Sequence, residues 1–354
     1  MPRGEGHTLR AMSTPDGIDR EGVEAWFADH VGSSVPPLEF ERITGGRSNL
    51  TYRVTDAADG QWVLRRPPLS GGLGSAHDMK REFTIVSALD GTDVPVPGAV
   101  GYEPDDGVTG AEFYVMDFVD GVVLRDEGVV ESELPGEDER QRVGESLVDT
   151  LARLHAVNPD DVGLGELGRR EGYVERQLKR WKKQWDASKT RELEAIDEVH
   201  ARLSENVPEQ QDVAIVHGDY RLDNVIVGSD CDIAAVVDWE LCTLGDPLAD
   251  VGLLLVYWAE PGDQIVPLTR APTLASGFPT RRDLVERYAS RTGRDLSAID
   301  FYVALGYWKL AAILEGVYAR YAGGAYGQSE DDYKNFPKIV EQLAEAAAKT
   351  AGAT

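Results

Sequence analysis

The fold of this chain is decided by two short stretches, IVHGDYRLDNVIV at residues 215–227 and IAAVVDWE at residues 233–240. Three apolar runs rich in Val and Ile surround a polar loop. This pattern predicts short buried strands that carry acidic and amide side chains at their ends. Oxygen-bearing side chains held in this way suit metal-assisted chemistry.

The order of these polar residues matches the needs of phosphoryl transfer from a nucleoside triphosphate. That reaction requires a carboxylate that orients the attacking hydroxyl and hard oxygen ligands that hold Mg²⁺ on the phosphates. In kinases an Asn follows the catalytic Asp within the same loop, and a second Asp ends a later strand. Asp219, Asn224 and Asp238 follow that order. We therefore predict Asp219 as the catalytic residue and Asn224 and Asp238 as the Mg²⁺ ligands.

The string HGDYRLDN, followed by VVDWELCTLGDPLADVG, resembles the aminoglycoside phosphotransferase and choline kinase-like family of small-molecule kinases. It is most similar to the branch related to the kinase-like domain attached to some acyl-CoA dehydrogenases. The resemblance covers about residues 35–330. It implies an α+β, protein kinase-like fold, in which ATP and Mg²⁺ bind between an N-terminal lobe with an antiparallel sheet and one main helix and a larger, mainly helical C-terminal lobe.

Three segments are expected on this basis. Residues 1–16 are polar and without periodicity, which predicts a flexible tail. Residues 17–118 are predicted to form the nucleotide-binding lobe, and residues 119–354 the catalytic and acceptor-binding lobe.

The first lobe is predicted to hold the nucleotide phosphates with a hairpin tip. Residues 38–43 and 50–54 alternate like strands and flank a glycine-rich turn. Glycines let the backbone approach phosphate oxygens, and neighbouring polar side chains can donate further hydrogen bonds. The residues predicted for this role are Gly45, Gly46, Arg47, Ser48 and Asn49.

The third strand, residues 61–66, is expected to carry a cation for the phosphates, held by a Glu of the next helix. Arg65 and Glu82 occupy those places, with Arg66 as the competing register. The family more often uses Lys, but Arg keeps its charge and can bind phosphate through two hydrogen bonds. The resemblance further implies that backbone groups near Met116, Asp117 and Phe118 meet the adenine edge.

Further polar residues are predicted to support the catalytic loop. His217 is expected to brace it through hydrogen bonds, and Asp250 is expected either to cap a helix or to pair with Arg221 or His217. His155, next to an apolar stripe, is interpreted as a hydrogen-bonded core histidine. Gly218 replaces the Arg that in protein kinases can pair with an activation-loop phosphate, so regulation of that kind is not expected.

The charge balance excludes some partners. Acidic residues outnumber basic ones by 62 to 36, giving a formal charge of −26, which argues against binding to a nucleic-acid backbone. The basic residues comprise 9 Lys and 27 Arg. An acidic, Lys-poor surface is typical of proteins from a high-salt cytoplasm, where screening removes self-repulsion. An acidic pocket for a cationic substrate is the alternative explanation.

The remaining sequence features predict location and thiol chemistry. No apolar run reaches the length of about 20 residues that a membrane span needs, and the first residues lack the apolar core of a secretion signal. We therefore expect a cytoplasmic protein with no membrane partner. The 2 cysteines, Cys231 and Cys242, are predicted to pack as small apolar groups, and no zinc site is expected.

The predicted reaction is transfer of the γ-phosphoryl group of ATP, or GTP, to a hydroxyl of a small molecule. The resemblance favours a hydroxyacyl-CoA or a hydroxy acid as acceptor. An aminoglycoside or a choline- or homoserine-type metabolite is the alternative within the kinases. A non-catalytic nucleotide-binding module is the alternative of another class, but the presence of Asp219, Asn224 and Asp238 counts against it.

Overall fold

The computed structural model describes residues 14–43, 49–69, 78–263, 265–267, 270–323 and 334–352. The chain divides into two compact units. The first comprises Met1–Asp90 and Pro97–Val119, and the second comprises Gly91–Val96 and Asp120–Thr354. The division falls next to the expected boundary at residue 118, except that the segment 91–96 belongs to the second unit.

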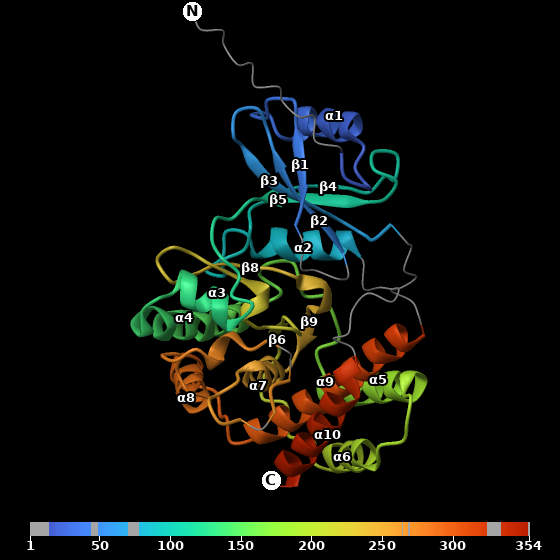
Figure 1. Ribbon diagram of the computed structural model, residues 1–354, viewed down its shortest axis with the longest axis vertical. Coiled ribbons are helices and arrows are strands. Elements are labelled where there is room, and N and C mark those ends of the chain that lie inside the picture. The colour runs from blue at the N-terminus through green and yellow to red at the C-terminus, as the bar shows by residue number, and fades with distance from the viewer. Residues whose placement is uncertain are drawn as a thin grey trace, which may run out of the picture. The chain divides into compact units, whose positions relative to one another are not determined.

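The first unit is built on a five-stranded antiparallel sheet with the order β1-β2-β3-β5-β4 (Figure 1). Its strands are β1 (Glu39–Arg42), β2 (Leu50–Thr55), β3 (Gln61–Arg66), β4 (Ala99–Glu103) and β5 (Phe113–Asp117). The predicted strands at 38–43, 50–54 and 61–66 are confirmed. In β2, buried residues alternate with partly exposed ones, as expected for a strand with two differently packed faces.

A helix packs against each face of this sheet. The helix α1 (Arg20–His30) buries Val23, Trp26 and Phe27 in one apolar core, where Trp26 and Phe27 meet aromatic rings of the strands. The helix α2 (Met79–Leu89) packs Met79 and Phe83 against Val63, Tyr114 and Met116 on the other face. Asp78 begins α2 as its N-cap, since its side chain accepts a hydrogen bond from the Arg81 N–H at 2.9 Å.

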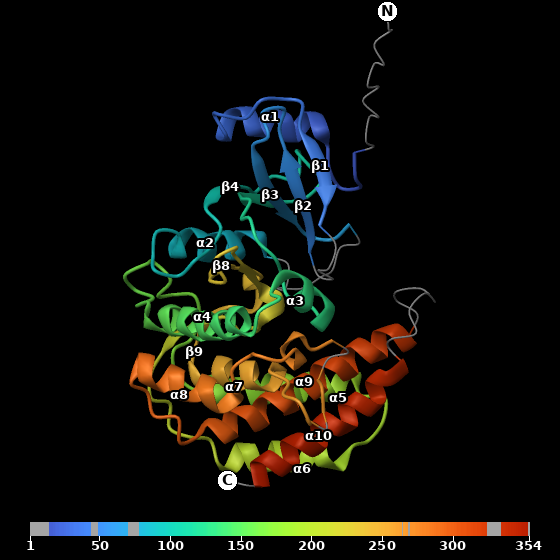
Figure 2. The same cartoon turned by 60° about the vertical axis from the view of Figure 1, so that its left-hand side comes forward.

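The second unit is mainly helical. Its helices are α3 (Glu127–Glu133), α4 (Glu137–Ala156), α5 (Tyr173–Ser188), α6 (Glu194–Glu205), α7 (Leu248–Tyr257), α8 (Arg281–Thr292), α9 (Ile299–Ala322) and α10 (Phe336–Gly352). The long helix α9 contacts α5, α6, α7 and α10, and it therefore forms the centre of this helical layer (Figure 2). The helix α4 buries apolar residues at helical intervals, among them Val143, Leu147, Leu151 and Leu154.

Two small antiparallel strand pairs frame the loop that follows β6. The strand β6 (Ala214–Val216) pairs with β9 (Thr243–Gly245), and β7 (Val225–Val227) pairs with β8 (Ile233–Val236), both antiparallel. Short 3-10 turns complete the segment at η2 (Leu222–Asn224) and η3 (Trp239–Leu241), and a further turn, η4, covers Pro272–Leu274. The three apolar runs around the loop are therefore strands, as predicted.

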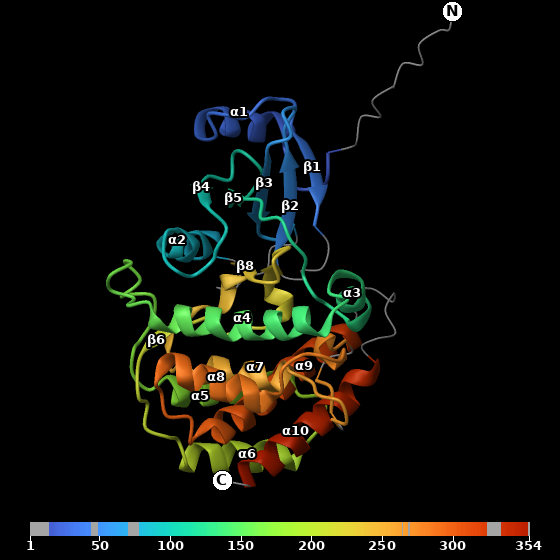
Figure 3. The same cartoon turned by 90° about the vertical axis from the view of Figure 1, so that its left-hand side faces the viewer.

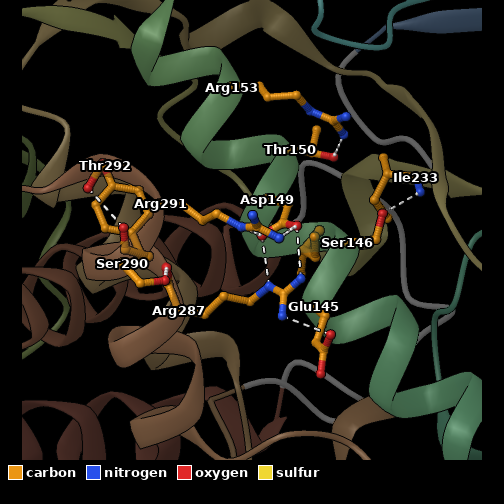
Figure 4. Close-up of polar contacts among 12 residues, drawn as sticks. Glu145, Ser146, Asp149, Thr150, Arg153, Ile233, Arg287, Ser290, Arg291 and Thr292 are labelled. Carbon is orange, nitrogen blue, oxygen red and sulfur yellow. Dashed lines mark hydrogen bonds and ion pairs between the residues drawn. The ribbon is translucent and has the colours of Figure 1, made fainter.

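Charged side chains join α4 to α8, which run beside each other (Figure 3). Arg287 of α8 donates to Asp149 at 2.7 Å and to Glu145 at 2.8 Å, both on α4. Arg291, one turn further along α8, donates to the same Asp149 carboxylate at 2.8 Å (Figure 4). Two guanidinium groups thus share one carboxylate across a helix pair.

The two cysteines have different surroundings. Cys242 is buried, as predicted for a thiol packed as a small apolar group, whereas Cys231 is partly exposed in the β7–β8 turn. No helix in the described ranges combines the length and the apolarity that crossing a bilayer would require.

Candidate active site

The loop after β6 is held by the buried carboxylate of Asp250 in α7. Its two oxygens accept hydrogen bonds from the backbone N–H groups of His217, at 2.7 Å, and Gly218, at 2.8 Å. His155 Nε2 of α4 lies 3.3 Å from the same carboxylate. Burial alone would raise the pKa of Asp250, but these neighbouring donors outweigh it and lower the pKa. Asp250 therefore supports the loop through backbone groups of His217 and Gly218, and not through Arg221.

His217 braces the loop from inside. Its ring is fully buried, Nε2 lies 3.0 Å from the Val237 carbonyl, and Nδ1 accepts a hydrogen bond from the Asp219 N–H at 3.3 Å. Because Nδ1 accepts, the ring proton sits on Nε2 and is donated to Val237. Both ring nitrogens of His217 therefore contact backbone groups, one in the loop and one after β8. His155, fully enclosed between Asp250 and the Tyr288 hydroxyl, is the predicted core histidine.

Gly218 is required by the backbone at this point. Its φ is +85°, and a Cβ there would lie only 2.9 Å from the Leu241 carbonyl oxygen. Any other residue would combine an unfavourable left-handed backbone with this clash. Position 218 therefore needs glycine because the loop packs closely against η3.

Asp219 and Asn224 are joined directly. The Asn224 Nδ2 group donates to the Asp219 backbone carbonyl at 2.8 Å and to its Oδ2 at 2.9 Å. Because the amide nitrogen is used by Asp219, the amide oxygen of Asn224 is the atom left to act as a ligand. The Asn224 side chain, at the end of η2, therefore orients the Asp219 carboxylate. It also leaves its own amide oxygen available as a ligand.

Asp238 lies at the same end of the β7–β8 pair as Asn224. The strand register sets Val225 opposite Val236, and the Val237 N–H donates to the Asn224 carbonyl at 3.0 Å. Asp238 follows directly, with a left-handed backbone at φ +69° that few non-glycine residues adopt. Such backbone conformations cluster at functional sites. The structure thus brings the predicted trio to one place in the second unit.

Arg221 links the carboxylates of this loop. It forms ion pairs with Asp219, at 3.5 Å, and with Asp223, and its guanidinium lies 4.9 Å from the centre of the Tyr257 ring. Burial acts to lower the pKa of Arg221, but the negative charges around it, including that of Asp238, outweigh burial and raise it. Arg221 thus lies within a cluster of carboxylates and pairs with two of them, Asp219 and Asp223.

Three contributors to the second unit's site were missed by sequence reasoning. The Tyr257 hydroxyl hydrogen-bonds to Asp219, and burial raises the pKa of that hydroxyl. Asp223 pairs with Arg221, and Lys309 of α9 donates to the Gly218 carbonyl. Tyr257 and Lys309 lie in helical segments whose other residues are mostly apolar or aromatic. The only sequence signal for them was a polar group among apolar neighbours.

In the first unit, Arg65 and Glu82 form the predicted ion pair. Arg65 Nε lies 2.9 Å from Glu82 Oε2, and Glu82 is only 1% exposed. The same carboxylate accepts hydrogen bonds from Asn49 Nδ2 at 3.0 Å and from the Tyr114 hydroxyl at 3.1 Å. The Arg65 side chain is therefore fixed in position by a carboxylate that is itself held by Asn49, directly before β2, and by Tyr114 of β5.

The contacts of Arg66 differ from those of Arg65. This side chain is buried and donates to the backbone carbonyl of Thr109 at 2.7 Å and also to that of Gly17. Since adjacent strand residues point to opposite faces, Arg65 and Arg66 cannot share the Glu82 contact. Arg66 thus links the segments around Gly17 and Thr109. Arg65 stays the residue that we propose to bind phosphate.

The other residues predicted to bind nucleotide are placed as follows. Gly45, Gly46, Arg47 and Ser48 lie outside the described residues. Met116 is buried at the end of β5, and the N–H groups of Asp117 and Phe118 donate to the carbonyls of Gly98 and Gln61. An adenine contact at 117 or 118 would therefore use a carbonyl oxygen.

Comparison with known proteins gives this geometry a family context. Residues 39–301 match the APH phosphotransferase enzyme family. The chain is 33% identical to human acyl-CoA dehydrogenase family member 11 over 340 residues, which cover 93% of this chain and 42% of that protein. The chain thus spans less than half the length of this relative.

Solved structures of phosphotransferases are similar to this chain in fold. A putative aminoglycoside phosphotransferase from Ralstonia eutropha has a TM-score of 0.80 and 32% identity, covering 95% of this chain and 99% of the other. A thermostable mutant of aminoglycoside phosphotransferase APH(4)-Ia, in complex with ADP and hygromycin B, has a TM-score of 0.58 and 15% identity, covering 92% and 98%. The predicted kinase-like fold is confirmed. The chain belongs to the APH phosphotransferase family and is homologous to the kinase-like region of the acyl-CoA dehydrogenase family members.

Proposed function

We propose that this chain transfers the γ-phosphoryl group of ATP, or GTP, to a hydroxyl of a small molecule. The observation that carries the proposal is the double hydrogen bond from Asn224 to Asp219, formed at the end of the β7–β8 pair that also bears Asp238. In this arrangement the loop before β7 supplies a carboxylate for the hydroxyl and one oxygen ligand for a cation, and the segment after β8 supplies a second oxygen ligand.

Asp219 is proposed to orient the acceptor hydroxyl and take its proton. Asn224 and Tyr257 hold the carboxylate in place, and Arg221 balances part of its charge. The hydroxyl oxygen then forms a bond to the γ-phosphorus while the bond to the bridging oxygen of the leaving diphosphate breaks. Because the carboxylate is positioned before the acceptor arrives, most of the rate gain would be positional and electrostatic.

The side chains present fit Mg²⁺. The Asn224 amide oxygen and the Asp238 carboxylate are hard oxygen donors, and Mg²⁺ commonly uses one or two protein ligands together with phosphates and waters. When bound there, Mg²⁺ would neutralise charge on the transferred phosphate. In the first unit, Arg65, fixed by Glu82, is proposed to bind phosphate oxygens through its guanidinium, and Asn49 belongs to the same cluster.

The acceptor is proposed to be a hydroxyacyl-CoA or a related hydroxy acid. The support is the 33% identity to a protein named for acyl-CoA dehydrogenation, in which this chain corresponds to 42% of the length. A kinase joined to such an enzyme would act on a hydroxylated acyl compound before or after the dehydrogenase step.

The test is product formation across a panel of hydroxyl compounds. Purified protein is mixed with Mg²⁺ and ATP or GTP, together with hydroxy acids, hydroxyacyl-CoA thioesters, choline, homoserine or aminoglycosides. Phosphorylated products are identified by mass spectrometry, and nucleotide binding is followed in parallel by thermal shift. Transfer to a hydroxyl supports the proposal, whereas nucleotide binding with no product from any compound favours a non-catalytic module.

A further inference from the structure

A cavity lies between α5 and α6, two helices of the second unit that pack against each other (Figure 1). Its volume is about 520 Å³, which is within the range of about 300–1,000 Å³ typical of small-molecule sites. The α5 residues that line it recur at intervals of three and four, so they share one face of the helix. The charged residues of this lining are Glu175, Lys179, Lys182, Lys183 and Asp186.

The lining of the cavity is positively charged, although the chain is strongly acidic. Three lysines, Lys179, Lys182 and Lys183, line the cavity together with two carboxylates, Glu175 and Asp186. The formal charge of the whole chain is −26. A net positive lining favours an anion in the cavity and opposes a cation.

Lys182 joins the two helices beside the cavity. Its Nζ lies 2.6 Å from Asp186 Oδ1 of α5 and 3.2 Å from Asp197 Oδ1 of α6. Burial acts to lower the pKa of Lys182, but the hydrogen bonds and charges of these two carboxylates outweigh it and raise the pKa. Because Asp186 and Asp197 are paired with Lys182, they oppose a bound anion less than unpaired carboxylates would.

Lys179 and Lys183 have different surroundings from Lys182. Both are exposed, and neither ammonium forms an ion pair or a hydrogen bond within the segments that the structure describes. They lie four residues apart on one face of α5, so both ammonium groups can approach the same ligand. Each can donate three hydrogen bonds. Their combined charge matches that of a phosphate group, which is about −2 at neutral pH.

The rest of the lining suits an organic molecule. Leu178 and Val207 contribute apolar surface, and His200 of α6 contributes an imidazole. Burial, together with the positive charge of Lys182, lowers the pKa of His200, so the ring is neutral at neutral pH and has one N–H donor. Apolar surface beside ammonium groups favours a phosphate ester over inorganic phosphate alone.

We propose that the α5–α6 cavity binds the phosphate groups of an organic phosphate, with Lys179 and Lys183 as the main donors. Two sources share this chemistry. The phosphates can belong to a coenzyme A thioester that serves as acceptor, or to a separate small molecule that binds only here. The binding site itself does not depend on the proposed kinase function.

The test measures binding by calorimetry without ATP. The probes are coenzyme A, inorganic pyrophosphate and pantetheine, which has the thiol arm of coenzyme A without its phosphates. The wild type is compared with the double variant Lys179→Ala/Lys183→Ala. The matched control is Lys338→Ala/Lys349→Ala, which removes the same charge from two exposed lysines of α10. Circular dichroism checks that both variants are folded.

We expect coenzyme A and pyrophosphate to bind the wild type and the control equally, and to bind the Lys179/Lys183 variant at least about tenfold more weakly, as for loss of charge-assisted hydrogen bonds. Pantetheine should bind much more weakly than coenzyme A to the wild type. The inference would be overturned if neither phosphate compound bound the wild type, or if both bound the Lys179/Lys183 variant as tightly as the wild type.

Kinetics with Mg-ATP distinguish the two sources of the phosphates. If they belong to the acceptor, the Lys179/Lys183 variant should lower kcat/KM for a hydroxyacyl-CoA and leave that for a free hydroxy acid unchanged. If they belong to a separate ligand, phosphate binding should be lost while both kcat/KM values keep their ratio. A protein that binds coenzyme A through these lysines but transfers no phosphoryl group would support the cavity site and contradict the kinase function instead.

Discussion

Asp246 and Asp250 are both buried carboxylates near the start of α7, but they hold different parts of the molecule. Asp246 Oδ1 accepts from the Leu248 N–H at 3.0 Å and its Oδ2 accepts from the Tyr302 hydroxyl at 2.6 Å. It thus accepts from the first residue of α7, two positions further along the chain, and ties α7 to α9. Asp250 instead accepts from the N–H groups of the catalytic loop. Variants of these two carboxylates can therefore distinguish an effect on the loop from an effect on the stability of α7.

Asp250→Asn is expected to reduce kcat strongly and to lower the free energy of unfolding by about 2 kcal/mol, since a buried charged acceptor with several donors is lost. The measurements are steady-state kinetics and urea unfolding. Asp246→Asn should cost similar stability while retaining far more kcat. Equal losses of kcat in folded samples of both variants would show that Asp250 has no special role in the loop.

Not all of the site can be predicted from single residues. Asp219, Asn224 and Asp238 follow a spacing whose chemistry is recognisable, and the structure brings them together. Tyr257 and Lys309 reach the same loop from α7 and α9, where their neighbours are apolar or aromatic. Their position depends on tertiary packing of helices distant in sequence, which local spacing does not encode.

At the scale of elements, the first unit positions Arg65 by joining β2, β3, β5 and α2 through one carboxylate. Glu82 of α2 pairs with Arg65 of β3 and accepts hydrogen bonds from Asn49, which directly precedes β2, and from Tyr114 of β5. Because Glu82 is buried, removal of its charge would leave these donors without a full set of acceptors. The nucleotide role proposed for Arg65 therefore depends on α2.

Glu82→Gln is expected to raise the KM for ATP by about tenfold, because Arg65 loses the charged partner that orients it. Tyr114→Phe is the matched control, since it removes another hydrogen bond from Glu82 and leaves the ion pair with Arg65. Its effect on the KM should be clearly smaller. Comparable KM values in Glu82→Gln and the wild type would rule out a phosphate-binding role that depends on this pair.

The α4–α8 pair gives a prediction about pH. Burial would raise the pKa of Asp149, but hydrogen bonds from Arg287 and Arg291 outweigh it and lower the pKa. A carboxylate with a lowered folded-state pKa stabilises the protein above its unfolded pKa of about 4, and this contribution is lost as the pH falls through the folded value.

Asp149→Asn should therefore lower the free energy of unfolding at neutral pH by about 1 kcal/mol, a modest effect because the pair is partly exposed. The difference from the wild type should shrink below a pH of about 4. Thermal unfolding across pH provides the measurement, with Glu198→Gln, an exposed site on α6, as control. A difference that is constant with pH would mean that the Asp149 charge contributes nothing.

Elements differed in how well they could be predicted. Residues 61–66 match β3 because the short apolar run 62–64 is followed directly by Pro67 and Pro68, which end the strand. The short strand β9 and the helix α3 were missed. β9 has only 3 residues and exists through its pairing with β6, which lies far back in the chain. Such non-local pairing leaves little trace in local sequence.

At the scale of the whole molecule, the formal charge of −26 is the dominant feature. Acidic residues occur along the whole chain, in both units, so repulsion among them opposes folding of each unit. Salt shortens the range of this repulsion from about 30 Å at 0.01 M to about 3 Å at 1 M. The predicted adaptation to a high-salt cytoplasm stays a prediction that stability can test.

We expect the melting temperature to rise steadily from dilute buffer to molar KCl, followed by circular dichroism. Sucrose at matched osmolality is the control, because it is excluded from protein surfaces without screening charge. A protein that is fully stable in dilute buffer and indifferent to KCl would remove the high-salt explanation and favour an acidic site for a cationic ligand.

The central claim is that Asp219 acts on the acceptor hydroxyl in a site that binds Mg-ATP independently of it. The most direct measurement compares Asp219→Ala with the wild type for two quantities in the same preparation, the affinity for Mg-ATP and the rate of phosphoryl transfer to the best acceptor of the panel. The account predicts nearly unchanged Mg-ATP affinity and a loss of transfer of at least about a hundredfold. Transfer at the wild-type rate by Asp219→Ala would contradict it.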